Sequence, residues 1–174
     1  MSYQIELVQD VLSPHREWVA DFNNVPHPTS LAKDMNDLAK WNWRIPSAAT
    51  YIDRLEWDVT VDPTAWFGEW RYKDKKDKWT TIWNRVICQG TYDKKTKMGS
   101  VTVKVKPTMY TKFKTDYPFM AVFYWAYLQT FYKGQIRKYL EQSQARVRDF
   151  DAVVRERLGL TQREEQGVAT RRPG

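Results

Sequence analysis

Side chains alternate between apolar and polar along most of the chain from Tyr51 to Lys114, and this period of two constrains the fold more than any other feature. The clearest run places Val101, Val103 and Val105 on one side, with threonine and lysine between them. Successive side chains of a β-strand point to opposite faces of the sheet, so the pattern predicts strands with one buried and one exposed face. Turn sequences separate four such strands, which predicts an antiparallel meander.

The residues before the meander predict one further strand and two short helices. Alternation over residues 3–11 indicates the strand. Ser13 followed by Pro14 is typical of a helix start, and we expect that helix to end near Phe22. An apolar stripe at helical spacing within 29–41 predicts the second helix.

A long helix is predicted to close the chain. Residues 119–132 are apolar nearly all round, but about 21 Å of helix cannot cross a hydrocarbon layer of about 30 Å. We therefore expect this segment to be a buried core helix rather than one lying on a membrane. Helical spacing continues to about Leu158, with a weak point expected at Gly134. The polar residues 159–174 are predicted to form a flexible tail.

Together these elements predict an α+β fold over residues 1–158, taken as a single domain: a curved antiparallel sheet of five or six strands, packed on a long C-terminal helix. The element order, with two short helices after the first strand, resembles the helix-grip fold of START and Bet v1-like proteins. That resemblance implies an apolar cavity between the sheet and the helix. Its expected lining is Trp57, Trp66, Trp70, Phe123 and Tyr127.

The cysteine content and the first residues bear on the compartment. Cys88 is the only cysteine, so no intramolecular disulfide can form, and a reducing compartment is expected. Residues 1–12 do not have the basic start and apolar run of a signal peptide. The sequence therefore predicts a cytoplasmic protein.

Groups that carry out catalysis are scarce. His15 and His27 are the only histidines, and each is expected at the surface. Neither a metal-ligand spacing nor a glycine-rich phosphate loop occurs in the sequence. Glu56 and Asp58 share one strand face, a spacing that is more common in solvated sheets than in acid–base pairs. We expect a protein without metal, cofactor or catalytic activity.

Positive charge is concentrated in the predicted meander. Residues 69–114 hold 13 Lys and Arg against 4 Asp and Glu, whereas the whole chain carries a net charge of +7. Lysines interleaved with aromatic rings are typical of surfaces that bind phosphates and stack on bases. The candidate residues for binding an anion or nucleic acid are Arg71, Tyr72, Lys73, Lys75, Lys76, Lys78, Tyr92, Lys94, Lys95, Lys97, Lys104, Lys106, Tyr110, Lys112 and Lys114.

Three hypotheses for function follow. The first is a non-catalytic binding or assembly protein that uses this basic, aromatic sheet face against an anionic partner, with nucleic acid favoured over a membrane surface or an acidic protein. The second is a helix-grip carrier of an apolar small molecule or lipid. The third is a structural subunit that forms homo- or hetero-oligomers through the C-terminal helix. An ordinary solvated, lysine-rich surface is the plain alternative to the first hypothesis.

Overall fold

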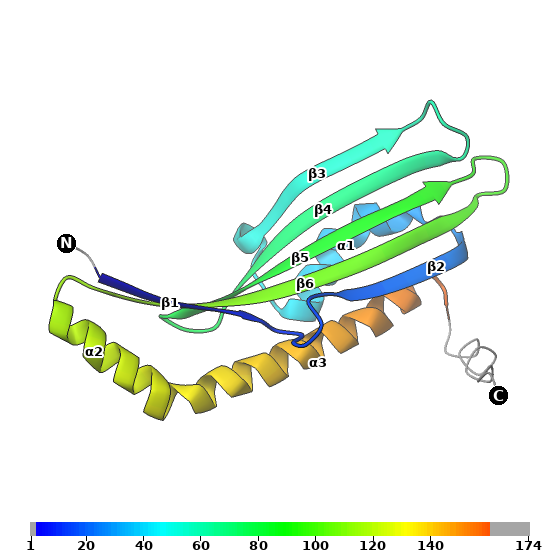
Figure 1. The fold of residues 1–174 in the computed structure, drawn as a ribbon. Coiled ribbons are helices and arrows are strands. Elements are labelled where there is room, and N and C mark those ends of the chain that lie inside the picture. The colour runs from blue at the N-terminus through cyan, green and yellow to red at the C-terminus, as the bar shows by residue number, and fades with distance from the viewer. Residues whose placement is uncertain (1–2, 161–174) are drawn as a thin grey trace.

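The computed structural model describes residues 3–160 and confirms the α+β fold (Figure 1). Six antiparallel strands form one curved sheet in the order β1-β6-β5-β4-β3, and β2 also pairs with β6. The strands are β1 (Tyr3–Asp10), β2 (Trp18–Pro26), β3 (Thr50–Asp58), β4 (Thr64–Lys75), β5 (Thr80–Tyr92) and β6 (Met98–Thr115). The helices are α1 (Thr29–Trp43), η1 (Ser47–Ala49), α2 (Pro118–Tyr127), η2 (Leu128–Tyr132) and α3 (Lys133–Arg157).

The helix expected from Pro14 to Phe22 is wrong, because residues 18–26 form strand β2. Strand β6 is 18 residues long, and β1 pairs only with its second half, residues 108–115. Buried backbone groups need hydrogen-bond partners, and β2 supplies them along the first half of β6, from Trp18 opposite Val105 onward. Two short strands thus share one long edge, and one of the two helices of the helix-grip order is missing.

The inner face of the sheet carries the core, covered by α1 and α3. Alternate residues of the meander point inward, as predicted, and Val101, Val103 and Val105 are buried against these helices. A second apolar cluster lies toward α2 and includes Ile82, Met109, Phe113 and Tyr132. The opposite, outer face has no helix over it in Figure 1, so its side chains are open to solvent.

The closing helix is irregular just before Gly134. Residues 128–132 form a π-helical segment, and Figure 1 shows α2 and α3 meeting there at an angle. Expecting the segment 119–132 to be buried was wrong for α2, which contains no buried residue and in which Phe123 is 63% exposed. Within the segment, only the line through Tyr124, Leu128 and Tyr132 rests on the second cluster.

Within residues 3–160, no helix is long and apolar enough to cross a membrane. The predicted tail 159–174 lies outside the described residues apart from its first two positions. Its flexibility, and the limits of the predicted domain, stay predictions.

Candidate functional site

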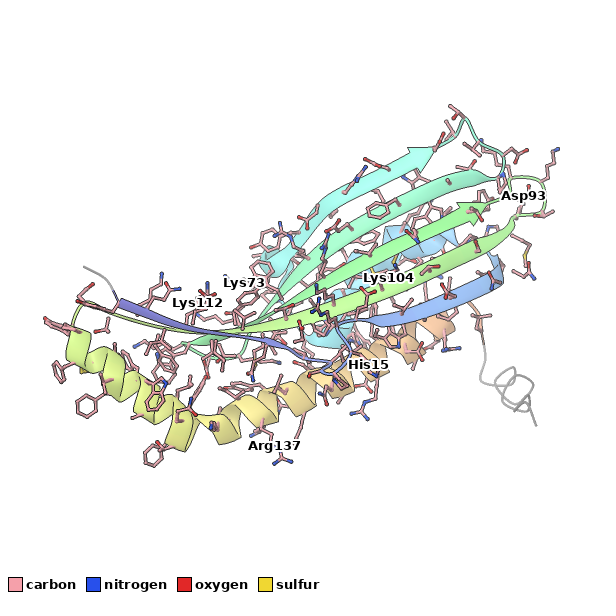
Figure 2. The ribbon with its side chains drawn as sticks, in the orientation of Figure 1. His15, Lys73, Asp93, Lys104, Lys112 and Arg137 are labelled. Atoms are coloured by element: carbon pink, nitrogen blue, oxygen red, sulfur yellow. The ribbon has the colours of Figure 1, made fainter. Side chains whose placement is uncertain are left out.

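The outer face of the sheet collects most of the predicted basic residues at one end. Strand pairing places the outward-facing residues of β4, β5 and β6 side by side. Cations that are far apart in sequence therefore become neighbours on this face. In Figure 2, Lys73 and Lys112 lie at the end of the sheet nearest β1, with Lys104 farther along the same face. The candidate site is built from two parts of this surface.

The first part is a row of three cations across three strands. Arg71 on β4 lies opposite Arg85 on β5, and Arg85 lies opposite Lys106 on β6. Like charges directly opposite one another in a sheet are destabilising. We call Arg71, Arg85 and Lys106 the cation row.

Two members of the cation row are partly neutralised by carboxylates. Arg71 pairs with Asp53 on β3, and the Nε of Arg85 lies 2.5 Å from Oε1 of Glu69. The hydrogen bond that Arg85 donates to Glu69 raises the pKa of Arg85, while the charge of Arg71 acts to lower it. Among residues 3–160, Lys106 forms no ion pair, so it completes the row as an uncompensated charge.

The second part is a half-open groove of about 500 Å³ beside the cation row. It lies where β6 runs on past the start of β5, and its lining comes from the β4–β5 turn, the outward-facing residues of the strands and Tyr124 of α2. We call it the basic groove. It is lined by Lys73, Lys78, Trp79, Thr81, Trp83, Tyr110, Lys112, Lys114 and Tyr124.

Cations and rings alternate within the basic groove. The Nζ of Lys73 lies 5.8 Å from the ring centre of Trp83, and Cζ of Arg71 lies at the same distance from that ring. Lys78 lies 5.9 Å from the ring centre of Trp79. Among the described residues, Lys73 and Lys78 form no ion pair, and each has a ring within cation–π distance. The groove therefore joins the cation row through Trp83.

A partly buried hydrogen-bond network holds the turn that forms one wall of the groove. The carboxylate of Asp77 accepts hydrogen bonds from the backbone N–H groups of Trp79 and Thr80 and from the hydroxyls of Tyr132 and Tyr139. Burial alone would raise the pKa of Asp77, but these hydrogen bonds outweigh it and hold the pKa below its usual value. The β4–β5 turn is thereby fixed to the closing helix.

The structure brings together eight of the fifteen residues predicted to bind an anion. Seven of them line the groove or belong to the cation row: Arg71, Lys73, Lys78, Lys106, Tyr110, Lys112 and Lys114. The eighth, Lys75, lies opposite Thr81, which in turn lies opposite Tyr110. Lys112 also pairs with Glu6, with its Nζ 2.9 Å from Oε1.

The other seven lie elsewhere. Lys94, Lys95, Lys97 and Tyr92 are at the β5–β6 turn, at the opposite end of the sheet, where Figure 2 labels Asp93. Tyr72 is fully buried on the inner face, and Lys76 pairs with Asp74 at 2.6 Å. Lys104 shares the outer face but lies beyond the cation row. The predicted residues thus do not form one continuous patch.

Five residues of the site were missed from the sequence: Trp79, Thr81, Trp83, Arg85 and Tyr124. The alternation along β5 could have identified three of them, since Thr81, Trp83 and Arg85 alternate with buried residues such as Ile82 and Val86. Tyr124 carried no such signal, because its position depends on how α2 packs.

The five residues expected to line an apolar cavity are not gathered around one space. Trp66 and Trp70 are buried in the first core cluster, and Trp57 stacks on Trp66 at the exposed edge strand β3. Tyr127 contacts Trp79, whereas Phe123 faces solvent. These side chains therefore do not line one common cavity. The hypothesis of an apolar carrier stays untested.

The arginines of α3, expected to form an assembly surface, are largely engaged within the chain. Arg146 donates a 2.8 Å hydrogen bond to the backbone carbonyl of Asn42. Arg155 pairs with Asp151, and Arg157 pairs with Asp34 on α1. The contacts of Arg146 and Arg157 tie α3 to α1.

The remaining reactive groups have ordinary environments. Cys88 is fully buried, and burial raises the pKa of its thiol, which disfavours the reactive thiolate. Glu56 pairs with Arg54, and hydrogen bonds from Thr60 hold the pKa of Asp58 below its usual value. Within residues 3–160, no three His, Cys, Asp or Glu side chains gather as metal ligands would.

Comparison with known proteins assigns no family: no protein-family model matches the chain, and no curated protein matches it significantly. The geometry of the chain's own residues therefore carries the functional argument.

Proposed function

We propose that this protein binds single-stranded nucleic acid on the outer face of its sheet, with the cation row and the basic groove as the contact surface. The observation that carries the proposal is the placement of Arg71, Arg85 and Lys106 directly opposite one another beside the groove. The proposed role is non-catalytic. The cytoplasm is the compartment we propose, since Cys88 is a free, buried thiol.

The cation row supports an anionic ligand because Lys106 adds an uncompensated charge beside two arginines that carboxylates already neutralise in part. Like charges directly opposite one another cost stability in a sheet, and a phosphate would relieve the repulsion that remains. A lysine-rich surface that serves only for solubility would be expected to disperse its charges instead. Lys106 together with Lys73, Lys78 and Lys114 of the groove thus argues for a ligand with several negative charges.

The rings of the basic groove support a ligand with flat bases. Trp83 and Tyr110 lie on the outer face, and Trp79 and Tyr124 form the end of the groove. Aromatic rings beside lysines bind unstacked bases of any sequence, since every base offers a flat face. The volume of about 500 Å³ is within the range of pockets for small ligands, which suits a nucleotide unit.

The proposal is tested by fluorescence anisotropy with labelled oligouridylate and oligothymidylate, and with duplex DNA as a third probe. Single strands should bind more tightly than duplex, and the logarithm of the association constant should fall with the logarithm of salt concentration by about 0.7 for each phosphate contacted. The variant K73E/K106E should lose at least about tenfold in affinity.

The matched control is K94E/K95E, which makes the same change of net charge at the far turn, outside the proposed surface. Its affinity should stay within about threefold of wild type, because these charges are farther from the ligand than screening allows at physiological salt. Failure of the wild type to bind any probe at low salt would contradict the proposal. An equal loss in both double variants would show that net charge alone, and not this surface, drives binding.

A further inference from the structure

The inference concerns α2, and it does not depend on the proposed nucleic-acid binding, although Tyr124 and Lys114 belong to both surfaces. This helix carries large apolar side chains that the fold leaves uncovered. The most exposed are Phe119 (61%), Val122 (67%), Phe123 (63%), Trp125 (57%) and, in the following π-helical turn, Phe131 (77%). Contiguous apolar surface of this kind marks an interaction site on a folded protein.

One side of α2 is firmly packed, so the exposed side chains are presented on a fixed support. The ring of Tyr124 stacks on Phe113 of β6 with centroids 5.3 Å apart, and Leu128 is buried in the second core cluster. Tyr127 makes an edge contact with Trp79. The helix therefore presents its remaining sides outward, and Figure 1 shows it at the periphery, below the end of the sheet.

The charges next to these side chains are positive. Residues 117–140 contain Lys133, Arg137 and Lys138 and no Asp or Glu. On the sheet, Lys114 lies just before the turn into α2. Only Arg137 of the three helix cations forms an ion pair among the described residues, with Glu141 at 3.0 Å. A partner that covers this region must tolerate or use positive charge.

We propose that α2 inserts its exposed aromatic side chains into the interface of a bilayer that contains anionic lipids, with the helix lying along the membrane surface. Phe, Trp and Tyr beside basic residues are the chemistry of interfacial helices, in which the rings enter the headgroup region and the cations meet lipid phosphates. The ten residues of α2 extend about 15 Å, so the helix lies on the bilayer and does not span it.

A bilayer suits this surface better than a second copy of the chain. The exposed side chains occupy more than one side of α2, and a fluid interface can surround several sides of a helix, whereas one flat protein surface cannot. A second copy would also bring a chain of net charge +7 against another, with the basic flanks of both helices close together. Anionic lipid headgroups instead complement those flanks.

The test is vesicle flotation of the full chain, with phosphatidylcholine vesicles made with and without phosphatidylglycerol. Wild type should float with the anionic vesicles and much less with the neutral ones. The variant F123E/W125E changes two side chains that are mainly in solvent, so it should keep its thermal unfolding midpoint and lose flotation by about tenfold or more. The control W41E/V59E alters two equally exposed apolar residues away from α2 and should float like wild type.

Three results would overturn the membrane proposal. Wild type could remain with the unbound fraction for both kinds of vesicle, or W41E/V59E could lose as much flotation as F123E/W125E. Sedimentation velocity could instead show self-association that F123E/W125E abolishes, without vesicle binding, which would assign α2 to a second copy. The uncharged variant F123S/W125S should also lose flotation but bind oligonucleotides like wild type, because it adds no negative charge beside Tyr124 of the basic groove, so failure here is distinguishable from failure of the proposed function.

Discussion

The hydroxyl of Tyr139 on α3 donates a 2.9 Å hydrogen bond to the carboxylate of Asp77 in the turn between β4 and β5. The two residues are 62 positions apart in the chain. Tyr132 donates to the same oxygen, and its hydroxyl lies 2.7 Å from that of Thr80. One carboxylate thus connects the β4–β5 turn, which forms one wall of the basic groove, to α3 and the π-helical segment before it.

Removal of this carboxylate should weaken the fold. D77A leaves the hydroxyls of Tyr132 and Tyr139 and two backbone N–H groups without their acceptor, so we expect a loss of about 1–3 kcal/mol in the free energy of unfolding. Urea titration measures it. The control D37A removes a carboxylate that is 84% exposed and should change stability by less than about 0.5 kcal/mol. A loss of that small size in D77A would contradict the structural role.

The stabilisation from Asp77 should depend on pH in a defined direction. Its pKa is lower in the folded state than in the unfolded chain, so its contribution is fully present above the unfolded value of about 3.9 and is lost as the pH falls through the folded value. The stability gap between wild type and D77N should be constant near neutral pH and narrow below about pH 4. Urea unfolding at a series of pH values measures the gap, and a gap that widened on acidification would refute the assignment.

The sheet could be predicted from the sequence because its signal is local. Each strand of the meander shows its own period of two, and turn residues mark its ends. Strand β2 was missed because Trp18 and Phe22, four residues apart, share a face in a helix and also in a strand. What decides between them is the unpaired half of β6, and that is a long-range requirement.

The candidate site was less predictable, since it depends on how elements meet. The turns at 75–79 and 93–97 are equally basic in sequence, but consecutive turns of a meander lie at opposite ends of the sheet, so only one can join the groove. The apolar sequence of α2 predicts a buried helix, but in the structure the helix is exposed. Such a conflict between local sequence and packing is expected where a surface is kept for function.

Removing a cation from the cation row should raise the stability of the fold and lower the affinity for oligonucleotides. K106T removes one of three opposed cations and adds a residue suited to strands, so stability at low salt should rise by about 0.2–1 kcal/mol while oligonucleotide affinity falls. The stability gain should shrink at and above about 0.15 M salt, because screening weakens the repulsion.

The control for the cation row is K114T. Lys114 lies opposite Gln4, so no cation repels it across the strand. Glu6 lies nearby, and its pKa is held below the usual value by the hydrogen bond from Lys112 and, to a smaller extent, by the charge of Lys114. K114T should therefore bring no gain in stability. Thermal unfolding at several salt concentrations compares the two variants, and an equal gain in both would rule out repulsion within the row.

Asn84 on β5 is fully buried, and among residues 3–160 neither polar atom of its side chain has a hydrogen-bond partner. It lies opposite Tyr72 and Pro107, between the two core clusters. A buried amide without partners costs about 1–3 kcal/mol, so N84V should match or exceed the stability of wild type. A loss of more than about 1 kcal/mol in urea titration would show that the amide binds a group that the valine cannot replace.

Two glycines should respond to alanine in opposite directions. A β-carbon at Gly68 on β4 would lie 2.6 Å from Cζ3 of Trp70 and closer still to Cη2, and that indole is buried and cannot move aside. G68A should therefore lose about 1–3 kcal/mol through overpacking. Gly134 on α3 has no atom within 4 Å of the same position, so G134A should gain about 0.5–1 kcal/mol from helix propensity. Urea titration of both variants measures the difference, and a stable G68A would mean that Trp70 packs less tightly on β4 than the structure has it.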